Sequence, residues 1–144
     1  MKFHLATLDN LEEIATLFHS CWHISYAELL SEEVRAAMNL EESKALWRPS
    51  LANPEDKETV IGISDSKIVS VFRIGRAKDD AGLGHLFSLY VDPITSGKGF
   101  GRKSLTEAFS LIKVMLMKEI SEFGYFINAD NFGNNPNLIY ISSS

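Results

Sequence analysis

Apolar and polar residues alternate along this chain in segments of two kinds. Between residues 10 and 26, apolar side chains recur at steps of three and four, which is the spacing of one face of an amphipathic helix. Other segments are short and rich in β-branched and aromatic residues, as strands are. The segments predicted as strands are 3–6, 59–63, 67–74, 85–91 and 124–129. Strands and helices mixed in one unit predict an α/β or α+β fold around a mixed sheet.

Local signals indicate where several elements begin and end. Ser31 and Asn39 have the residue types of helix N-caps, and the helix after Asn39 should end near Pro54 because the residue before proline disfavours helical angles. Residues 64–66 separate two strand-like runs and predict a hairpin. A long helix is expected over 102–120, and residues 131–137 are expected to form a loop because asparagine, glycine and proline dominate there.

Length and composition set the class of protein. With 144 residues, 45% of them apolar and 23% charged, the chain is expected to fold as one globular domain over residues 1–144. The net charge of −5 argues against general nucleic-acid binding, which requires a basic face. The single cysteine excludes an internal disulfide and a cysteine-rich zinc site. We see no signal peptide and no apolar run of membrane-spanning length, so a cytoplasmic protein with no membrane partner is expected.

Basic residues and glycines concentrate in one short segment of this acidic chain. They are Gly97, Lys98, Gly99, Gly101, Arg102 and Lys103. A strand over 85–91 leads into this segment and a helix follows it. Glycines let backbone N–H groups turn toward one point, and a helix start adds unpaired N–H groups and a positive dipole end. The segment therefore predicts a phosphate or pyrophosphate site, with a plain tight turn and a solvated basic rim as the alternative. Its glycine spacing fits neither a P-loop nor a dinucleotide-binding fingerprint.

The same segment resembles a known family signature. The run Leu89-Tyr90-Val91-Asp92-Pro93, followed by Ser96-Gly97-Lys98-Gly99-Phe100-Gly101-Arg102, is similar to the acetyl-CoA signature of the GNAT superfamily of N-acetyltransferases, Gln/Arg-x-x-Gly-x-Gly/Ala. Ser96 stands where the family has Gln or Arg, while Gly99 and Gly101 keep the two glycines. The region from Ser20 to Arg48 also resembles the first-helix region of small-molecule members. The resemblance covers about residues 1–118 and is most specific at 86–102.

The resemblance implies a fold and a cofactor site. The fold is a mixed, mostly antiparallel central sheet flanked by helices, with one strand pair splayed apart to receive coenzyme A. By this resemblance, acetyl-CoA is the co-substrate, and its pantetheine pairs with the backbone of Leu89, Tyr90 and Val91 like an added strand. The residues implied at the pyrophosphate are Ser96, Gly97, Lys98, Gly99, Phe100, Gly101 and Arg102. An N–H group near Leu89 would stabilise the oxyanion.

The resemblance also suggests which residues handle protons. Many relatives begin the fourth strand with a glutamate, and here that position is His85, whose ordinary pKa suits a general base. The alternative is a strand-edge histidine with no catalytic role. Tyr140 is the candidate acid for the departing thiolate. Asn131 resembles the asparagine that many relatives place near the coenzyme A arm.

Other polar residues have simpler interpretations. His19 and His23 have a metal-compatible spacing, but no third ligand is evident, so no metal is expected. Cys21 is interpreted as a small buried apolar residue. Trp22 and Tyr26 are expected either to pack in the core or to line the acceptor pocket. Four glutamates are expected to start helices in solvent, or to attract a cationic amine: Glu32, Glu33, Glu41 and Glu42.

Two functions remain open at this point. The first is an N-acetyltransferase acting by direct attack of a primary amine of a small molecule or protein. The second is a catalytically inactive protein that keeps the fold for coenzyme A binding or for interactions. Residues 134–140 depart from the family's next helix, and no sequence follows for its final strand pair. Because this would expose a sheet edge, and because the helix over 102–120 has extra apolar residues, we expect a second subunit to cover one of them in a homodimer.

Overall fold

The computed structural model describes residues 1–25, 27–80, 82–95, 97–122 and 139–141. Its strands are β1 (Lys2–Leu5), β2 (Lys57–Ser64), β3 (Lys67–Arg76), β4 (Gly84–Val91) and β5 (Ile139–Ile141). Its α-helices are α1 (Leu11–Ser20), α2 (Glu32–Ala37), α3 (Leu40–Ala52) and α4 (Phe100–Glu122). Three short helical turns complete the described elements: η1 (Leu8–Asn10), η2 (Cys21–Ser25) and η3 (Pro93–Thr95).

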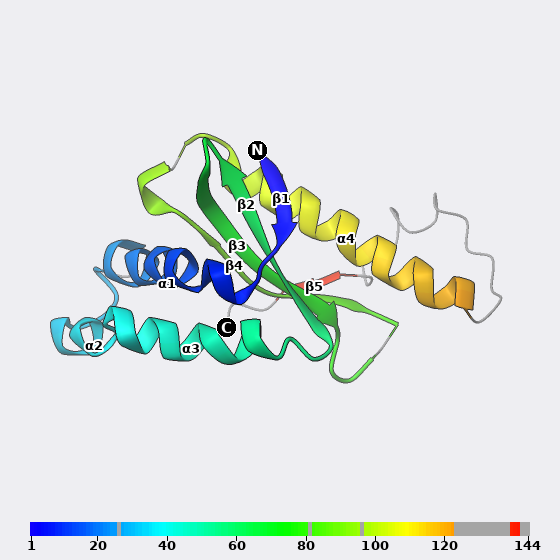
Figure 1. Ribbon diagram of the computed structural model, residues 1–144, viewed down its shortest axis with the longest axis horizontal. Helices are drawn as coiled ribbons and strands as arrows, with labels where there is room; N and C mark the ends of the chain where they lie inside the picture. The colour runs from blue at the N-terminus through cyan, green and yellow to red at the C-terminus, as the bar shows by residue number, and fades with distance from the viewer. Residues whose placement is uncertain (26, 81, 96, 123–138, 142–144) are drawn as a thin grey trace.

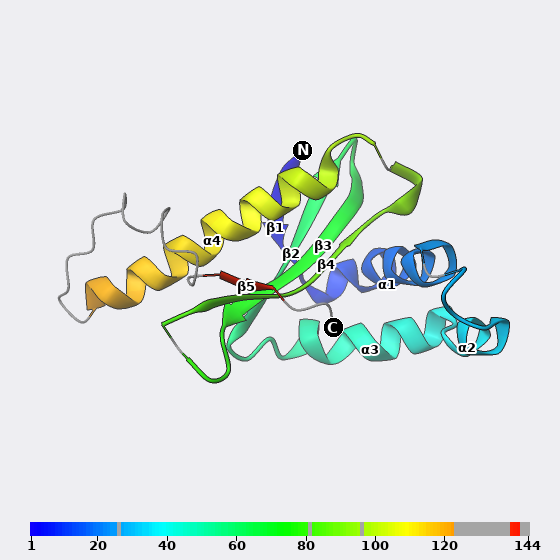
Figure 2. The ribbon, with the colours of Figure 1, turned by 180° about the vertical axis from the view of Figure 1, so that it is seen from behind.

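The strands form one sheet in the order β1-β2-β3-β4-β5. The first three pairings are antiparallel, and β5 joins β4 in parallel. α1 and α3 cover one face of the sheet, and α4 crosses the other (Figures 1 and 2). This arrangement confirms the predicted mixed, mostly antiparallel sheet flanked by helices.

Each face of the sheet has its own apolar core, because side chains alternate between faces along each strand. On the α1/α3 face the buried residues are Ile14, Leu17, Phe18, Cys21, Trp47, Leu51, Ile61, Ile68 and Val71. On the α4 face they are Val60, Phe72, Ile74, Leu86, Ala108, Ile112 and Leu116. Burial of Cys21 agrees with its interpretation as a small apolar residue.

The helix starts follow the predicted caps. The Ser31 side chain accepts a hydrogen bond from the Val34 N–H at 3.2 Å, and the Asn39 side chain accepts one from the Glu42 N–H at 2.9 Å. The first-turn glutamates of both helices are exposed, as expected. α3 ends at Ala52, directly before Asn53 and Pro54.

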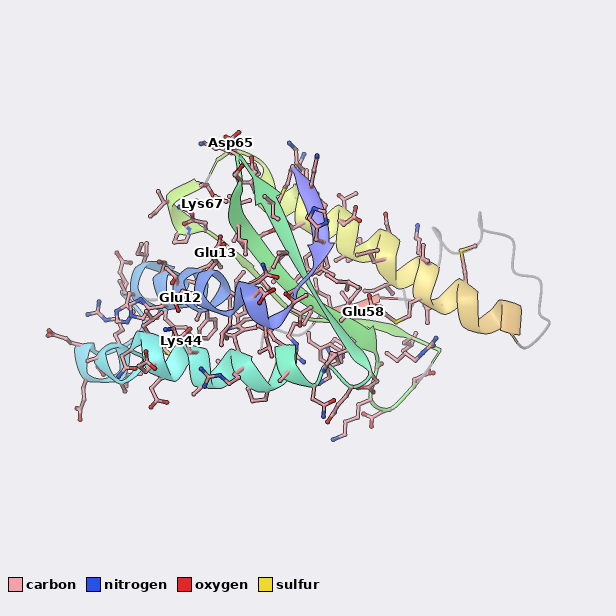
Figure 3. The ribbon with its side chains drawn as sticks, in the orientation of Figure 1. Glu12, Glu13, Lys44, Glu58, Asp65 and Lys67 are labelled. Carbon is pink, nitrogen blue, oxygen red and sulfur yellow. The ribbon has the colours of Figure 1, made fainter. Side chains whose placement is uncertain are left out.

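An ion pair joins the two helices of one layer. Lys44 Nζ on α3 lies 2.8 Å from Glu12 Oε2 on α1 and 3.5 Å from Glu41 Oε1. Figure 3 shows Lys44 and Glu12 between these helices. The Ser43 hydroxyl, which is fully buried, donates to the Ala15 carbonyl at 2.7 Å. These polar contacts fix α3 against α1 beside their shared apolar surface.

Some boundaries differ from the sequence prediction. The helix expected over 10–26 is α-helical only to Ser20 and continues as a π-helical turn, η2. α4 begins at Phe100 rather than at Arg102. β5 lies later than the strand predicted over 124–129, which falls outside the described residues, as does the loop predicted over 131–137.

Candidate active site

The end of β4 is held by Asp92, the buried residue that follows it. The Asp92 N–H donates to the Val69 carbonyl on β3 at 2.8 Å, which extends the ladder past the strand. Its side chain accepts from the Ile94 N–H at 3.0 Å, and its carbonyl accepts from the Thr95 hydroxyl at 2.9 Å. Asp92 therefore fixes the direction in which the chain enters the glycine-rich loop.

Two glycines of this loop have backbone angles that favour glycine. Gly97 has φ +87° and Gly99 has φ +79°, and a Cβ atom on either would meet nothing within 4 Å. These glycines are thus required by backbone conformation, while the space around them stays open. Ser96, between η3 and Gly97, lies outside the described residues.

α4 starts immediately after this loop. The Lys103 N–H donates to the Gly99 carbonyl at 3.1 Å, so the N–H groups of Phe100, Gly101 and Arg102 belong to the first turn, where an α-helix offers no backbone partners. Lys98, Arg102 and Lys103 are exposed around it. Two glycines with positive φ, the start of α4 and three exposed cations thus adjoin here, and the binding of an anion at this place stays a prediction.

The outer edge of β4 leads into this cradle. Because the Asp92 N–H bonds to Val69, Ser70 and Val91 form a non-hydrogen-bonded antiparallel pair, and the N–H and carbonyl of Val91 face away from β3. Because backbone groups alternate in direction along a strand, the N–H and carbonyl of Leu89, which pairs with Phe72, also face away from β3. The Val91 carbonyl accepts a hydrogen bond from Cys21 Sγ at 3.3 Å, which agrees with that direction.

β5 occupies only the beginning of this edge. Its register partners are Gly84, His85 and Leu86, and the described pairing stops there. On the other side, the β3 register skips one residue: Arg73 pairs with Ser88 and Ile74 with Leu86, so Phe87 is the extra residue of a β-bulge. Bulges bend a strand and are frequent beside active sites. The sequence analysis missed this bulge.

The bulge separates two sets of side chains on β4. Leu86 and Leu89 pack on the α4 side, whereas Tyr90 packs on the α1/α3 side. The Tyr90 ring meets Phe18 edge-on, with centroids 5.0 Å apart, and Trp47 at 6.0 Å. Trp22 stacks at a tilt on Phe18 at 6.2 Å, which supports its core-packing interpretation. Tyr26 lies outside the described residues.

His85 lies at the start of β4 and is half-buried. Its register partners are Gly75 on β3 and Tyr140 on β5. Its ring stacks on Phe87 with centroids 4.0 Å apart, and Lys57 Nζ lies 4.3 Å from the Phe87 ring. Burial lowers the pKa of His85, and the Lys57 charge lowers it further. The histidine is therefore neutral at neutral pH, as a general base must be.

The two predicted proton carriers are neighbours in the sheet. His85 and Tyr140 are register partners, so the fold brings these backbone positions together although 55 residues separate them (140 − 85 = 55). Asn131 lies outside the described residues.

Cys21 lies where α1 meets the end of β4. Burial raises the pKa of its thiol to about 11, with the Asp92 charge acting in the same direction. The Val91 carbonyl that accepts its hydrogen bond is on the open edge of β4. At neutral pH this thiol is therefore protonated and acts as a hydrogen-bond donor.

Two hollows lie on the α1/α3 side of the sheet. One, of about 250 Å³, is lined by Glu12, Glu13, Thr16, Leu17, Ser20, Lys67, Ile68, Asp92 and Ile94. The other, of about 280 Å³, lies at the end of α3 and is lined by Pro49, Ser50, Ala52, Asn53, Pro54, Glu55, Lys57 and Arg73. In the first hollow, Lys67 Nζ lies 3.6 Å from Asp92 Oδ2, and Glu12 is paired with Lys44, whereas the second hollow holds the cations Lys57 and Arg73.

Arg73 and Lys57 were missed by the sequence analysis. The available signal was a cation in the interior of a largely apolar strand, between Phe72 and Ile74. Such a residue faces either solvent or a functional hollow, and register is needed to decide which.

Metal ligation finds no support in the described residues. His19 and His23 stack with centroids 4.2 Å apart, and the second contacts the Met38 carbonyl through Nε2 at 2.9 Å. Within the ranges that the structure describes, no group of three or more His, Cys, Asp or Glu side chains could hold a metal. Among those residues, too, no helix combines the length and apolarity that crossing a membrane requires.

No protein-family model and no curated protein matches the sequence. Solved structures do match its fold. The PaiA N-acetyltransferase from Thermoplasma acidophilum, in complex with coenzyme A, is 21% identical with a TM-score of 0.63, over 79% of this chain and 72% of that one. A GNAT family acetyltransferase from Brucella melitensis, in complex with acetyl-CoA, is 14% identical with a TM-score of 0.55, over 76% and 66%.

A third solved structure extends the same likeness. The ribosomal-protein-alanine N-acetyltransferase from Brucella melitensis is 19% identical with a TM-score of 0.52, over 85% of this chain and 68% of that one. This chain thus spans about two thirds of the length of these structures. By this structural likeness the protein has the fold of the GNAT N-acetyltransferases.

Proposed function

We propose that this protein transfers the acetyl group of acetyl-CoA to a primary amine by direct attack. The observation that carries the proposal is a line of backbone groups that face away from β3 and lead into the glycine-rich loop. It begins where β5 pairing stops at Leu86, follows the outward amides of Leu89 and Val91, and ends at the turned loop around Gly99. An extended pantetheine arm matches the strand edge, and a pyrophosphate matches the loop and helix start.

Leu89, His85 and Tyr140 are the residues proposed to assist the bond changes and proton transfers of this reaction. The amine nitrogen forms a bond to the acetyl carbonyl carbon, and the bond from that carbon to sulfur breaks. Leu89 offers an outward N–H to the oxyanion, and one such donor contributes about 3 kcal/mol. His85, neutral because of its lowered pKa, takes the proton of the amine. Tyr140, its register partner, is the proposed donor to the thiolate.

Acetyl-CoA and amine panels test this function. Calorimetry should show binding of coenzyme A, and thiol release from acetyl-CoA should rise when a suitable amine is added. Failure to bind coenzyme A would overturn the proposal. Binding without thiol release for any amine would instead support the alternative, a coenzyme A-binding or interaction protein that keeps the fold without catalysis.

The acceptor class, a small molecule or a protein amino group, belongs to the same proposal. A matched panel of small amines and peptides with free N-termini distinguishes the two acceptor types.

A further inference from the structure

Arg73 lies in the middle of the sheet and forms an ion pair with no described residue. Its strand neighbours Phe72 and Ile74 are 0% exposed and belong to the α4 core, while Val71 belongs to the α1/α3 core. Alternation therefore turns Arg73 to the α1/α3 side. There it lines the 280 Å³ hollow.

The Arg73 guanidinium has a hydrogen-bond donor that is not used by the described residues. Its Nε–H is buried without a hydrogen-bond partner, and no described residue forms an ion pair with Arg73. Arg73 is half-buried, and charges that lose hydration are normally paired because that loss is costly. Burial also lowers the pKa of Arg73, which reflects the same loss of hydration. An anion entering the hollow would supply the missing partner.

The rest of the hollow favours a small anion. Lys57 adds a second cation, and Ser50 and Asn53 are polar residues in its lining. Glu55, the acidic residue of that lining, is exposed and forms no ion pair with Arg73. The planar guanidinium is suited to two parallel hydrogen bonds with a carboxylate.

The hollow adjoins the proposed reaction site. Arg73 is the register partner of Ser88, directly after the bulge, and His85 is the partner of Gly75 two residues along the same strand. Two residues correspond to about 7 Å along a strand. Lys57 lies over the ring of Phe87, which in turn stacks on His85.

We infer that Arg73, with Lys57 beside it, binds a carboxylate on the amine acceptor, so that the acceptor is an amino acid-like molecule carrying both groups. This inference rests on the proposed acetyl transfer for the position of the amine. It assigns Arg73 to acceptor binding, outside the coenzyme A cradle and outside the proton transfers.

A direct test observes the Arg73 Nε–H by ¹H–¹⁵N NMR, with its signal assigned by its loss in Arg73→Lys. Amino acids are titrated against their decarboxylated amines: alanine against ethylamine, phenylalanine against phenethylamine and lysine against cadaverine. The amino acids should shift the signal and the amines should not. If no amino acid shifts it at millimolar concentration, or both members of each pair shift it equally, the inference is overturned. This readout needs no turnover, so it fails or succeeds separately from the proposed function.

Kinetics provide the second readout. Arg73→Gln should raise KM for the preferred amino acid about 10- to 100-fold with little change in kcat, and should leave its decarboxylated amine unaffected. Lys2→Gln is the matched control, because Lys2 is an exposed cation far from the hollow. It lies opposite Ile63 in the sheet, at the far end of β2 from Lys57. Unchanged coenzyme A binding confirms that each variant is folded. Equal losses with both acceptors would refute a carboxylate site.

Discussion

Gly97 and Gly99 matter for their backbone angles, because the space around their missing side chains is open. Gly101 differs from them. It lies inside α4, and a Cβ there would be 3.6 Å from Val91 Cγ2, an ordinary contact. Backbone conformation therefore favours glycine at positions 97 and 99 but not at 101, and substitution can separate the two cases.

Gly99→Ala should weaken coenzyme A binding and lower the free energy of unfolding by about 1 kcal/mol, since an alanine at positive φ is strained. Gly101→Ala is the matched control and should keep both quantities near wild type, since alanine favours a helix. Calorimetry with coenzyme A and urea denaturation measure the two effects. Equal losses in both variants would show that the backbone angle at Gly99 is not the reason.

His85 is tested through the dependence of rate on pH. Only the neutral imidazole accepts a proton, and its pKa is lowered from 6.5, so kcat/KM should fall only as pH drops below 6.5. His85→Gln should reduce kcat/KM by about 100-fold or more and remove this acid limb. A profile that is the same in His85→Gln and in wild type would leave His85 as a strand residue without a catalytic role.

At the scale of elements, α3 contributes its last turn to the hollow and its apolar face to the core. Its start depends on the Asn39 cap. Asn39→Ala should lower the free energy of unfolding by about 1 kcal/mol, because the Glu42 N–H loses its acceptor. Asn39→Asp should retain most of the wild-type free energy of unfolding, because aspartate also caps helices. Urea denaturation measures both, and equal stability of Asn39→Ala and wild type would contradict a structural role for this cap.

Local signals in the sequence predicted the elements that depend on near neighbours. Ser31 and Asn39 cap helices, and Asp65 and Ser66, with φ of 51° and 62°, make the predicted hairpin turn. The loop around Gly99 was also predictable, because its glycines and helix start adjoin in sequence. These features need only a few residues of context.

The bulge at Phe87 and the direction of Arg73 were not predictable in this way. Both depend on how β3 and β4 align, and a one-residue shift in that alignment reverses the face of every later side chain. α4 begins at Phe100, two residues before the basic pair that suggested the boundary, because the Gly99 carbonyl accepts the first helical hydrogen bond from the Lys103 N–H.

For the whole molecule, the layers separate two tasks. The α4 side holds the loop and helix start proposed for the pyrophosphate, and the α1/α3 side holds both hollows. β4 is the strand that connects them. In the proposed transfer, acetyl-CoA and the amine would therefore reach β4 from different sides of the sheet.

Assembly is the remaining expectation at this scale. α4 exposes Val114 by 48% and Met117 by 38%, so we expect this face to be covered in a homodimer. Light scattering should give twice the monomer mass at micromolar concentration, and Val114→Glu should give the monomer. Leu46→Glu, at another exposed apolar position on α3, is the control. A monomer at every micromolar concentration would refute this expectation.

The hydrogen bond from Cys21 to the Val91 carbonyl has a practical consequence for enzymology. This chain has one cysteine, and it is both shielded and protonated far above neutral pH. A chromogenic disulfide reagent would therefore give little background from the native protein while it counts each newly freed coenzyme. The Cys21 thiol would become reactive when α1 separates from β4. The rate at which the reagent labels Cys21 in the native protein would therefore report how often α1 and β4 separate.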